Sequence, residues 1–170
     1  MKNKCLFLDR DGVINYDLGY VYLVKEFKFR EEIFRICEYA QNNFYKIIVI
    51  TNQAGIGRGY YKEDDFIRIN QYMLQSFIKR NIFIDHVYFC PFHPKNGKGK
   101  YLKDSKDRKP NPGMILKAVK NYNIDIKRSI MIGDKESDRK AAYRAGLIYY
   151  IDANQIDWEK KSIDLMMKIK

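Results

Sequence analysis

The sequence has few cysteines and no long apolar segment, and each shortage excludes a class of protein. Its three cysteines are widely spaced, which argues against a disulfide framework and favours reduced thiols. No apolar run approaches the ~20 residues that span a bilayer, and no signal-peptide core follows the first residues. There is also no P-loop, internal repeat or low-complexity segment. We therefore expect a cytoplasmic, monomeric protein with no membrane partner.

Positive charge is the main feature of the composition. The 170 residues carry a formal net charge of +11, and 46% of them are hydrophobic, which is ordinary for a globular protein. We expect one domain over residues 1–170, long enough to bury ~70% of its unfolded surface. Such a charge can draw an anionic substrate into a cleft or bind a nucleic-acid backbone. The lysines are dispersed, with one richer stretch at 95–109, so charge alone does not decide between these.

Apolar runs that predict strands alternate with amphipathic segments that predict helices. Strands are expected at residues 5–8, 46–51, 82–90, 128–132 and 147–151, and helices at residues 30–44, 62–80, 112–122, 137–145 and 155–169. Alternation of this kind predicts the α/β class with a central parallel sheet. Two stretches lie outside the pattern. Residues 15–29 are aromatic and predict an ordered loop or hairpin over the site, and residues 91–111 predict a long irregular loop.

Polar residues recur near the ends of the predicted strands, where open α/β sheets bind ligands. Asp9 and Asp11 follow the first strand, and two close carboxylates need a cation or a shared proton. Mg²⁺, which binds carboxylates together with phosphate oxygens, meets this need. The same edge is expected to hold Thr51, Asn52, Arg108, Lys109, Asp134 and Asp138. Such a set suits phosphoryl transfer, in which one carboxylate attacks phosphorus and another moves protons.

These residues resemble the signature motifs of the haloacid dehalogenase superfamily. The motifs are Asp9-x-Asp11-Gly12, Thr51 after an apolar strand, Lys109, and Gly133-Asp134 followed by Asp138. Blocks at residues 9–12, 19–21, 51–59, 90–94, 108–114 and 133–135 resemble one branch of it, the heptose bisphosphate and histidinol phosphatases. The resemblance covers residues 6 to 145. It implies a three-layer Rossmann-like fold without a large cap domain, and removal of the 7-phosphate of D-glycero-D-manno-heptose 1,7-bisphosphate.

The resemblance also implies a role for each site residue. Asp9 would form an aspartyl-phosphate, Asp11 would be the general acid and base, and Thr51 and Lys109 would hold the phosphoryl group. Mg²⁺ would be bound by Asp9, the Asp11 carbonyl and Asp134, with Asp138 behind them. The implied substrate-binding residues are Asp17, Gly19, Tyr20, Asn52, Gln53, Arg58, Arg108 and Lys135. Arg108 would contact a remote phosphate. The two histidines, His86 and His93, are expected to be structural or surface residues, because the mechanism already has its acid and base.

The sequence departs from the related enzymes at their zinc loop, which has Cys-x-His followed by Cys-x-Cys. Only Cys90 matches, and the other three positions hold Phe92, Ser105 and Asp107. One thiolate cannot make a tetrahedral zinc site, so we expect no zinc. The loop must then be held by other contacts or be mobile.

Other functions fit part of the pattern. The same chemistry could act on histidinol phosphate or on a nucleic-acid 3′-phosphate, which the positive charge would suit. A non-catalytic basic binding module would require the loss of site acids, yet Asp9, Asp11 and Asp134 are all present. We therefore expect a small phosphorylated sugar as the partner and no nucleic acid.

Overall fold

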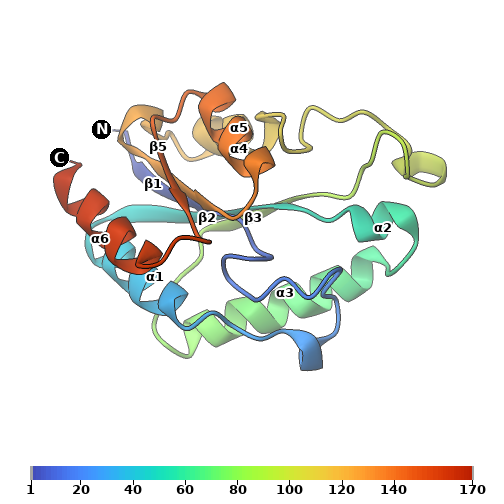
Figure 1. Cartoon of the computed structure of the whole chain (residues 1–170), viewed down its shortest axis with the longest axis horizontal. Coiled ribbons are helices and arrows are strands. Elements are labelled where there is room, and N and C mark those ends of the chain that lie inside the picture. The colour runs from blue at the N-terminus through green and yellow to red at the C-terminus, as the bar shows by residue number, and fades with distance from the viewer. Residues whose placement is uncertain (1, 170) are drawn as a thin grey trace.

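The computed structural model describes residues 2–169 and has a five-stranded parallel sheet between two layers of helices (Figure 1). The strands are β1 (Lys4–Leu8), β2 (Tyr45–Asn52), β3 (His86–Cys90), β4 (Ile130–Gly133) and β5 (Tyr149–Asp152). Their order across the sheet is β3-β2-β1-β4-β5, and every neighbouring pair is parallel. The prediction of an α/β fold with a central parallel sheet is confirmed.

The helices cover both faces of the sheet because both faces are apolar. In β1, Leu6 and Leu8 belong to one hydrophobic core and Cys5 and Phe7 to the other, as expected when successive side chains point to opposite faces. The first core is covered by α1 (Glu32–Asn42), α3 (Glu63–Ile78) and α6 (Trp158–Lys168), and the second by α4 (Gly113–Asn121) and α5 (Glu136–Ala145). This double burial explains why the strands are continuous apolar runs.

Two local features differ from the sequence-based expectation. The third strand begins at His86 rather than at residue 82, because the chain first turns back at the end of α3. Asn81 has a left-handed φ of 59°, and the Ile82 amide donates to the Phe77 carbonyl. The glycine-rich stretch after β2 also contains a short helix, α2 (Ala54–Arg58), which the pattern did not indicate.

The loops at the carboxyl edge of the sheet surround the candidate site. The segment between β1 and α1 contains one 3₁₀ helix, η1 (Val24–Glu26), and no large inserted unit within the described chain. Its two ends meet in an antiparallel bridge between Asn15 and Phe29, so the segment is ordered as expected. The loop between β3 and α4 carries η2 (Gly99–Tyr101) and reaches α2 (Figure 1). The third 3₁₀ helix, η3 (Ile126–Arg128), leads into β4. In residues 2–169, no helix combines the length and apolar character that crossing a membrane requires.

Candidate active site

Four charged side chains converge where β1 and β4 end. Asp9 follows β1, Asp134 follows β4, and Asp138 lies in the first turn of α5. Lys109 comes from the loop before α4, and its Nζ lies 2.8 Å from Asp9 Oδ1 and 2.6 Å from Asp138 Oδ1. The Lys109 ammonium also donates to the Ile50 carbonyl at 2.8 Å. The structure therefore brings together the acids and the lysine that the sequence placed at one sheet edge.

The cluster has more negative charge than its lysine can balance. Carboxylate oxygens of Asp9, Asp134 and Asp138 lie within 4.8 Å of one another. Burial, reinforced by the Asp138 charge, raises the pKa of Asp9 to about 8, although Lys109 opposes this. Burial also raises the pKa of Asp134 to about 6. Asp134 Oδ1 is buried and has no hydrogen-bond partner. Lys135 Nζ lies 3.8 Å from the other oxygen, Asp134 Oδ2, so Oδ1 is the oxygen left to bind a cation.

Mg²⁺ fits the donors that are present. Hard oxygen ligands from one or two carboxylates are what this ion prefers, and Asp9 and Asp134 supply them. Asp138 is already engaged, because it pairs with Lys109 and accepts from the backbone amides of Asp134 and Lys135 at 3.3 and 3.1 Å. It is therefore placed to orient its neighbours. Gly12 has a φ of 94°, and a Cβ there would lie 2.2 Å from Asp134 Oδ2. Only glycine permits this approach.

The Asp11 carboxylate is held by several N–H donors. Arg10 donates to it from Nε at 3.1 Å and from Nη2 at 2.8 and 2.9 Å. Asn15 and Gln53 donate at 3.0 and 3.1 Å. Arg10 is 0% exposed and also donates to the Val21 carbonyl at 2.8 Å. Its guanidinium therefore fixes Asp11 relative to the loop that covers the site. This role of Arg10 was missed, although the residue lies between the two acids of the motif.

A second hydrogen-bond chain connects Asp11 to Thr51 and Tyr61 through one amide. Gln53 Nε2 donates to Thr51 Oγ1 at 2.8 Å as well as to Asp11. The Tyr61 hydroxyl donates to Gln53 Oε1 at 2.5 Å. Burial raises the pKa of Tyr61, so the hydroxyl keeps its proton. Because a hydroxyl donor faces the carbonyl oxygen of Gln53, the amide nitrogen must face Asp11 and Thr51. Tyr61 was not among the predicted site residues, because nothing in the sequence distinguishes it from the other 13 of the 14 tyrosines.

Tyr61→Phe should therefore lower kcat about fivefold while leaving KM near the wild-type value, as expected for the loss of one net hydrogen bond of ~1 kcal/mol. Without the hydroxyl, Gln53 can turn its oxygen toward Asp11 and Thr51. Steady-state phosphate release measures both constants. Tyr60→Phe is the matched control, because Tyr60 is 54% exposed, and it should behave as the wild type. A Tyr61→Phe enzyme with unchanged kcat would contradict this role.

A pocket of about 520 Å³ opens beside the charged cluster. It is lined by most of the predicted substrate and catalytic residues, namely Asp11, Asp17, Gly19, Tyr20, Asn52, Gln53, Arg58, Arg108, Lys109 and Lys135. Ala54, which the resemblance also implied as part of the sugar pocket, lines it as well, together with three residues that were not predicted: Tyr61, Pro110 and Ser137. Asp9, Thr51, Asp134 and Asp138 do not line this pocket.

Two contacts across this pocket hold its walls in place. Asn52 donates to the Lys109 carbonyl and accepts from the Lys109 amide, both at 3.0 Å. This clasp fixes the backbone that carries the buried lysine. Lys135 Nζ pairs with Asp17 Oδ2 at 2.7 Å, which ties the loop after β1 to the start of α5. The structure thus places Asn52, Asp17 and Lys135 where they both shape the pocket and face it.

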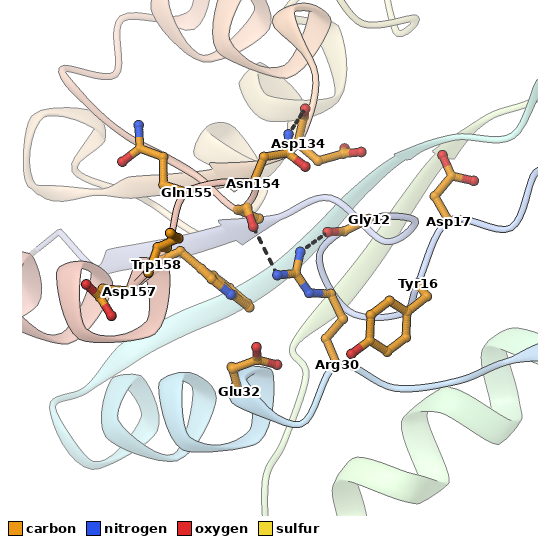
Figure 2. Close-up of a pocket in the computed structure, with 12 residues that line it drawn as sticks. Gly12, Tyr16, Asp17, Arg30, Glu32, Asp134, Asn154, Gln155, Asp157 and Trp158 are labelled. Carbon is orange, nitrogen blue, oxygen red and sulfur yellow. Dashed lines mark hydrogen bonds between the residues drawn. The ribbon is translucent and has the colours of Figure 1, made fainter.

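A second hollow of about 600 Å³ lies against Gly12 and Asp134 (Figure 2). Arg30 spans it by donating to the Gly12 carbonyl at 2.6 Å and to the Ala153 carbonyl at 3.0 Å, with its guanidinium over the Trp158 ring. Asn154 donates to the Asp134 carbonyl at 2.7 Å. These contacts brace the backbone of the charged cluster from outside. Arg30 and Asn154 were not among the predicted site residues.

The positions of the absent zinc ligands make other contacts. Cys90 and Ser105 are both buried, and their side chains hydrogen-bond. Asp107 forms an ion pair with Lys117, and the Phe92 ring packs 6.1 Å from that of Tyr101. The loop is further attached by the Lys98 amide, which donates to the Gly57 carbonyl at 2.8 Å. The loop is therefore ordered through hydrogen bonds and packing, and the expectation of no zinc stays a prediction.

The parallel sheet, the acidic cluster at its carboxyl edge and the buried lysine define an enzyme of the haloacid dehalogenase class. Comparison with known proteins agrees, since the sequence model of the HAD-hydrolase-like family matches residues 107–149. A D-glycero-alpha-D-manno-heptose-1,7-bisphosphate 7-phosphatase from Burkholderia mallei is 52% identical over 86% of this chain and 78% of its own. The enzyme of that name from Campylobacter jejuni is 44% identical over 100% and 92%. A Haemophilus influenzae enzyme with the beta name is 42% identical over 84% and 77%.

The chain belongs to the family of D-glycero-D-manno-heptose-1,7-bisphosphate 7-phosphatases. It is accordingly a Mg²⁺-dependent phosphoric monoester hydrolase. Solved structures agree in fold. A Mesorhizobium loti protein assigned to the HAD-like phosphatases is 30% identical, with a TM-score of 0.92 over 99% of this chain and 88% of its own. The D,D-heptose 1,7-bisphosphate phosphatase of B. bronchiseptica, complexed with magnesium and phosphate, is 27% identical, with a TM-score of 0.76 over 85% and 77%.

Proposed function

We propose that the protein removes the 7-phosphate of D-glycero-D-manno-heptose 1,7-bisphosphate through an aspartyl-phosphate at Asp9. The observation that carries this proposal is the site itself. Buried Asp9, which is paired with Lys109, lies beside a pocket lined by cationic and polar side chains. Relatives at 42–52% identity bear this enzyme name. The pocket residues Arg58, Arg108 and Lys135 suit a substrate with a second anionic group.

In the proposed reaction, Asp9 attacks the phosphorus atom and the bond from phosphorus to the sugar oxygen breaks. Asp11 must carry a proton when the substrate is bound; it gives this proton to the departing sugar oxygen and regains one from the water that hydrolyses the aspartyl-phosphate. Lys109 orients Asp9 through their 2.8 Å contact and offsets charge on the phosphoryl oxygens. Thr51, held by Gln53, contributes its hydroxyl to the same group. Bound Mg²⁺ supplies charge neutralisation beside the carboxylates.

The experiment that tests the function compares substrates at equal concentration by phosphate release. We expect the α anomer of the heptose bisphosphate to be hydrolysed fastest, because the relative at 52% identity and the one that matches 100% of this chain bear the alpha name. The β anomer, histidinol phosphate and an oligonucleotide 3′-phosphate are the competing substrates. EDTA should abolish release and added Mg²⁺ should restore it. Higher kcat/KM for histidinol phosphate, or for the oligonucleotide with a steep loss in added salt, would reject the proposal.

A further inference from the structure

Three side chains that carry N–H donors meet where α2 approaches the loop of residues 91–111. Arg58 ends α2, and its Nη2 lies 3.5 Å from Nε2 of His93. Arg108 donates to the carbonyl of Phe92, next to His93, at 3.3 Å. Arg58 and Arg108 both line the 520 Å³ pocket. Within residues 2–169, no ion pair joins any of the three to a carboxylate.

The backbone of the loop fixes which nitrogen of His93 carries the proton. The amides of Lys95 and Asn96 both donate to His93 Nδ1, at 3.2 and 3.0 Å. In a neutral imidazole with Nδ1 as the acceptor, Nε2 must bear the hydrogen. Burial, together with the charges of Arg108, Arg58 and Lys95, lowers the pKa of His93, which keeps the ring neutral near pH 7. His93 therefore presents a fixed N–H donor toward Arg58.

Two donors then face each other without an acceptor between them. A guanidinium has only donors, so Arg58 Nη2 cannot accept the hydrogen of His93 Nε2. Arg58 Nε is also buried and has no hydrogen-bond partner. Burial lowers the pKa of Arg108, and the charge of Arg58 lowers it further. An anionic oxygen placed here would accept from both neighbours and offset the charge.

We propose that His93 is a further specificity residue of this site, donating from its neutral Nε2 to the second anionic group of the substrate beside the predicted substrate-binding residues Arg58 and Arg108. This inference rests on the proposed function, in which the substrate carries two phosphates. The two arginines supply charge and planar forks, and His93 adds a donor whose direction the loop sets. His93 is thus a specificity residue, whereas a structural or surface role was predicted for it.

The test compares two substrates that differ only in the second phosphate. For His93→Ala we expect kcat/KM on the heptose 1,7-bisphosphate to fall about tenfold, mainly through KM, as for the loss of one hydrogen bond to a charged group. Its kcat/KM on the heptose 7-phosphate should match the wild type. His93→Gln, which retains an N–H donor, should restore part of the difference. His86→Ala is the matched control, because the chain's other histidine lies exposed at the far end of β3.

Equal losses on both substrates, or no loss on the bisphosphate, would overturn the subsite. If the wild type hydrolysed neither heptose compound, the proposed function would fail, and the subsite would be tested separately by binding. In that case calorimetry on Asp9→Asn protein would compare fructose 1,6-bisphosphate with fructose 6-phosphate. A preference for the bisphosphate that His93→Ala removes would support the subsite, and a preference that persists in His93→Ala would reject it.

Discussion

Replacing Asp9 with asparagine should reduce phosphate release by about 10⁴-fold or more, to the background of the assay. An amide cannot form the acyl-phosphate that the proposed reaction requires. In the wild type the Arg10 amide donates to Asp9 Oδ1 at 2.7 Å, and Lys109 Nζ lies 2.8 Å from the same oxygen. Asparagine has the same shape, so its side-chain oxygen can still accept hydrogen bonds from both. Phosphate release with Mg²⁺ present measures the loss, and circular dichroism checks the fold. Unchanged turnover in a folded variant would contradict the role of Asp9.

The same variant should unfold at a higher temperature than the wild type in metal-free buffer at neutral pH. Because the pKa of Asp9 is raised to about 8 in the folded protein, ionisation of this group costs folding free energy. Its contribution is fully favourable below the ordinary pKa of 3.8 and is lost as the pH rises toward 8. Asparagine does not ionise, so the variant does not lose this folding free energy as the pH rises. The difference in melting temperature should therefore shrink as the pH is lowered toward 4, and Mg²⁺ should reduce it at pH 7.

Lys109→Met should lower the rate of phosphate release about 10³-fold. It should also lower the free energy of unfolding by about 3–5 kcal/mol, the typical cost of removing one partner of a buried ion pair. Lys109 is 3% exposed and Asp138 is 0% exposed, so the carboxylates left behind cannot be solvated. The carbonyl of Ile50 also loses its donor. Urea unfolding in metal-free buffer measures the change in free energy, and phosphate release measures the change in rate.

A double variant separates the two effects of Lys109. Adding Asp138→Asn to Lys109→Met removes one of the uncompensated charges, so it should recover part of the stability and none of the activity. The control is Lys117→Met, because Lys117 pairs with Asp107 on the surface, where such a loss is worth at most ~1 kcal/mol. A Lys109→Met protein as stable as the wild type would mean that the lysine does not neutralise the cluster.

The sheet and its acidic edge were predictable because both depend on short-range patterns. Apolar runs marked all the strands, and parallel strands place Asp9 and Asp134 at one edge regardless of the loops. The start of β3 was not predictable, since Ile82 is apolar and buried but lies outside the ladder. Burial gives the same sequence signal whether or not a residue pairs in a sheet.

The supporting residues of the site were harder to find for a different reason. The hydrogen bond from Tyr61 to Gln53 depends on the turn that Gly59 allows between α2 and α3, and no periodicity reports it. The brace made by Arg30 joins segments 123 residues apart in the chain. Such contacts follow from tertiary packing, whereas motif residues follow from the chemistry of one short segment.

The way the loop of residues 91–111 is fastened bears on how this enzyme can evolve. A metal clamp with four ligands fails when any one ligand is lost, so a loop built on one is under strict selection at those positions. Here the fastening is divided among the Cys90–Ser105 contact, the Asp107–Lys117 pair, and Tyr101, whose hydroxyl donates to Glu63. The residues of each contact can be substituted without breaking the other contacts. The loop that carries His93 can therefore change by small steps, which leaves a gradual mutational route to new substrate preferences.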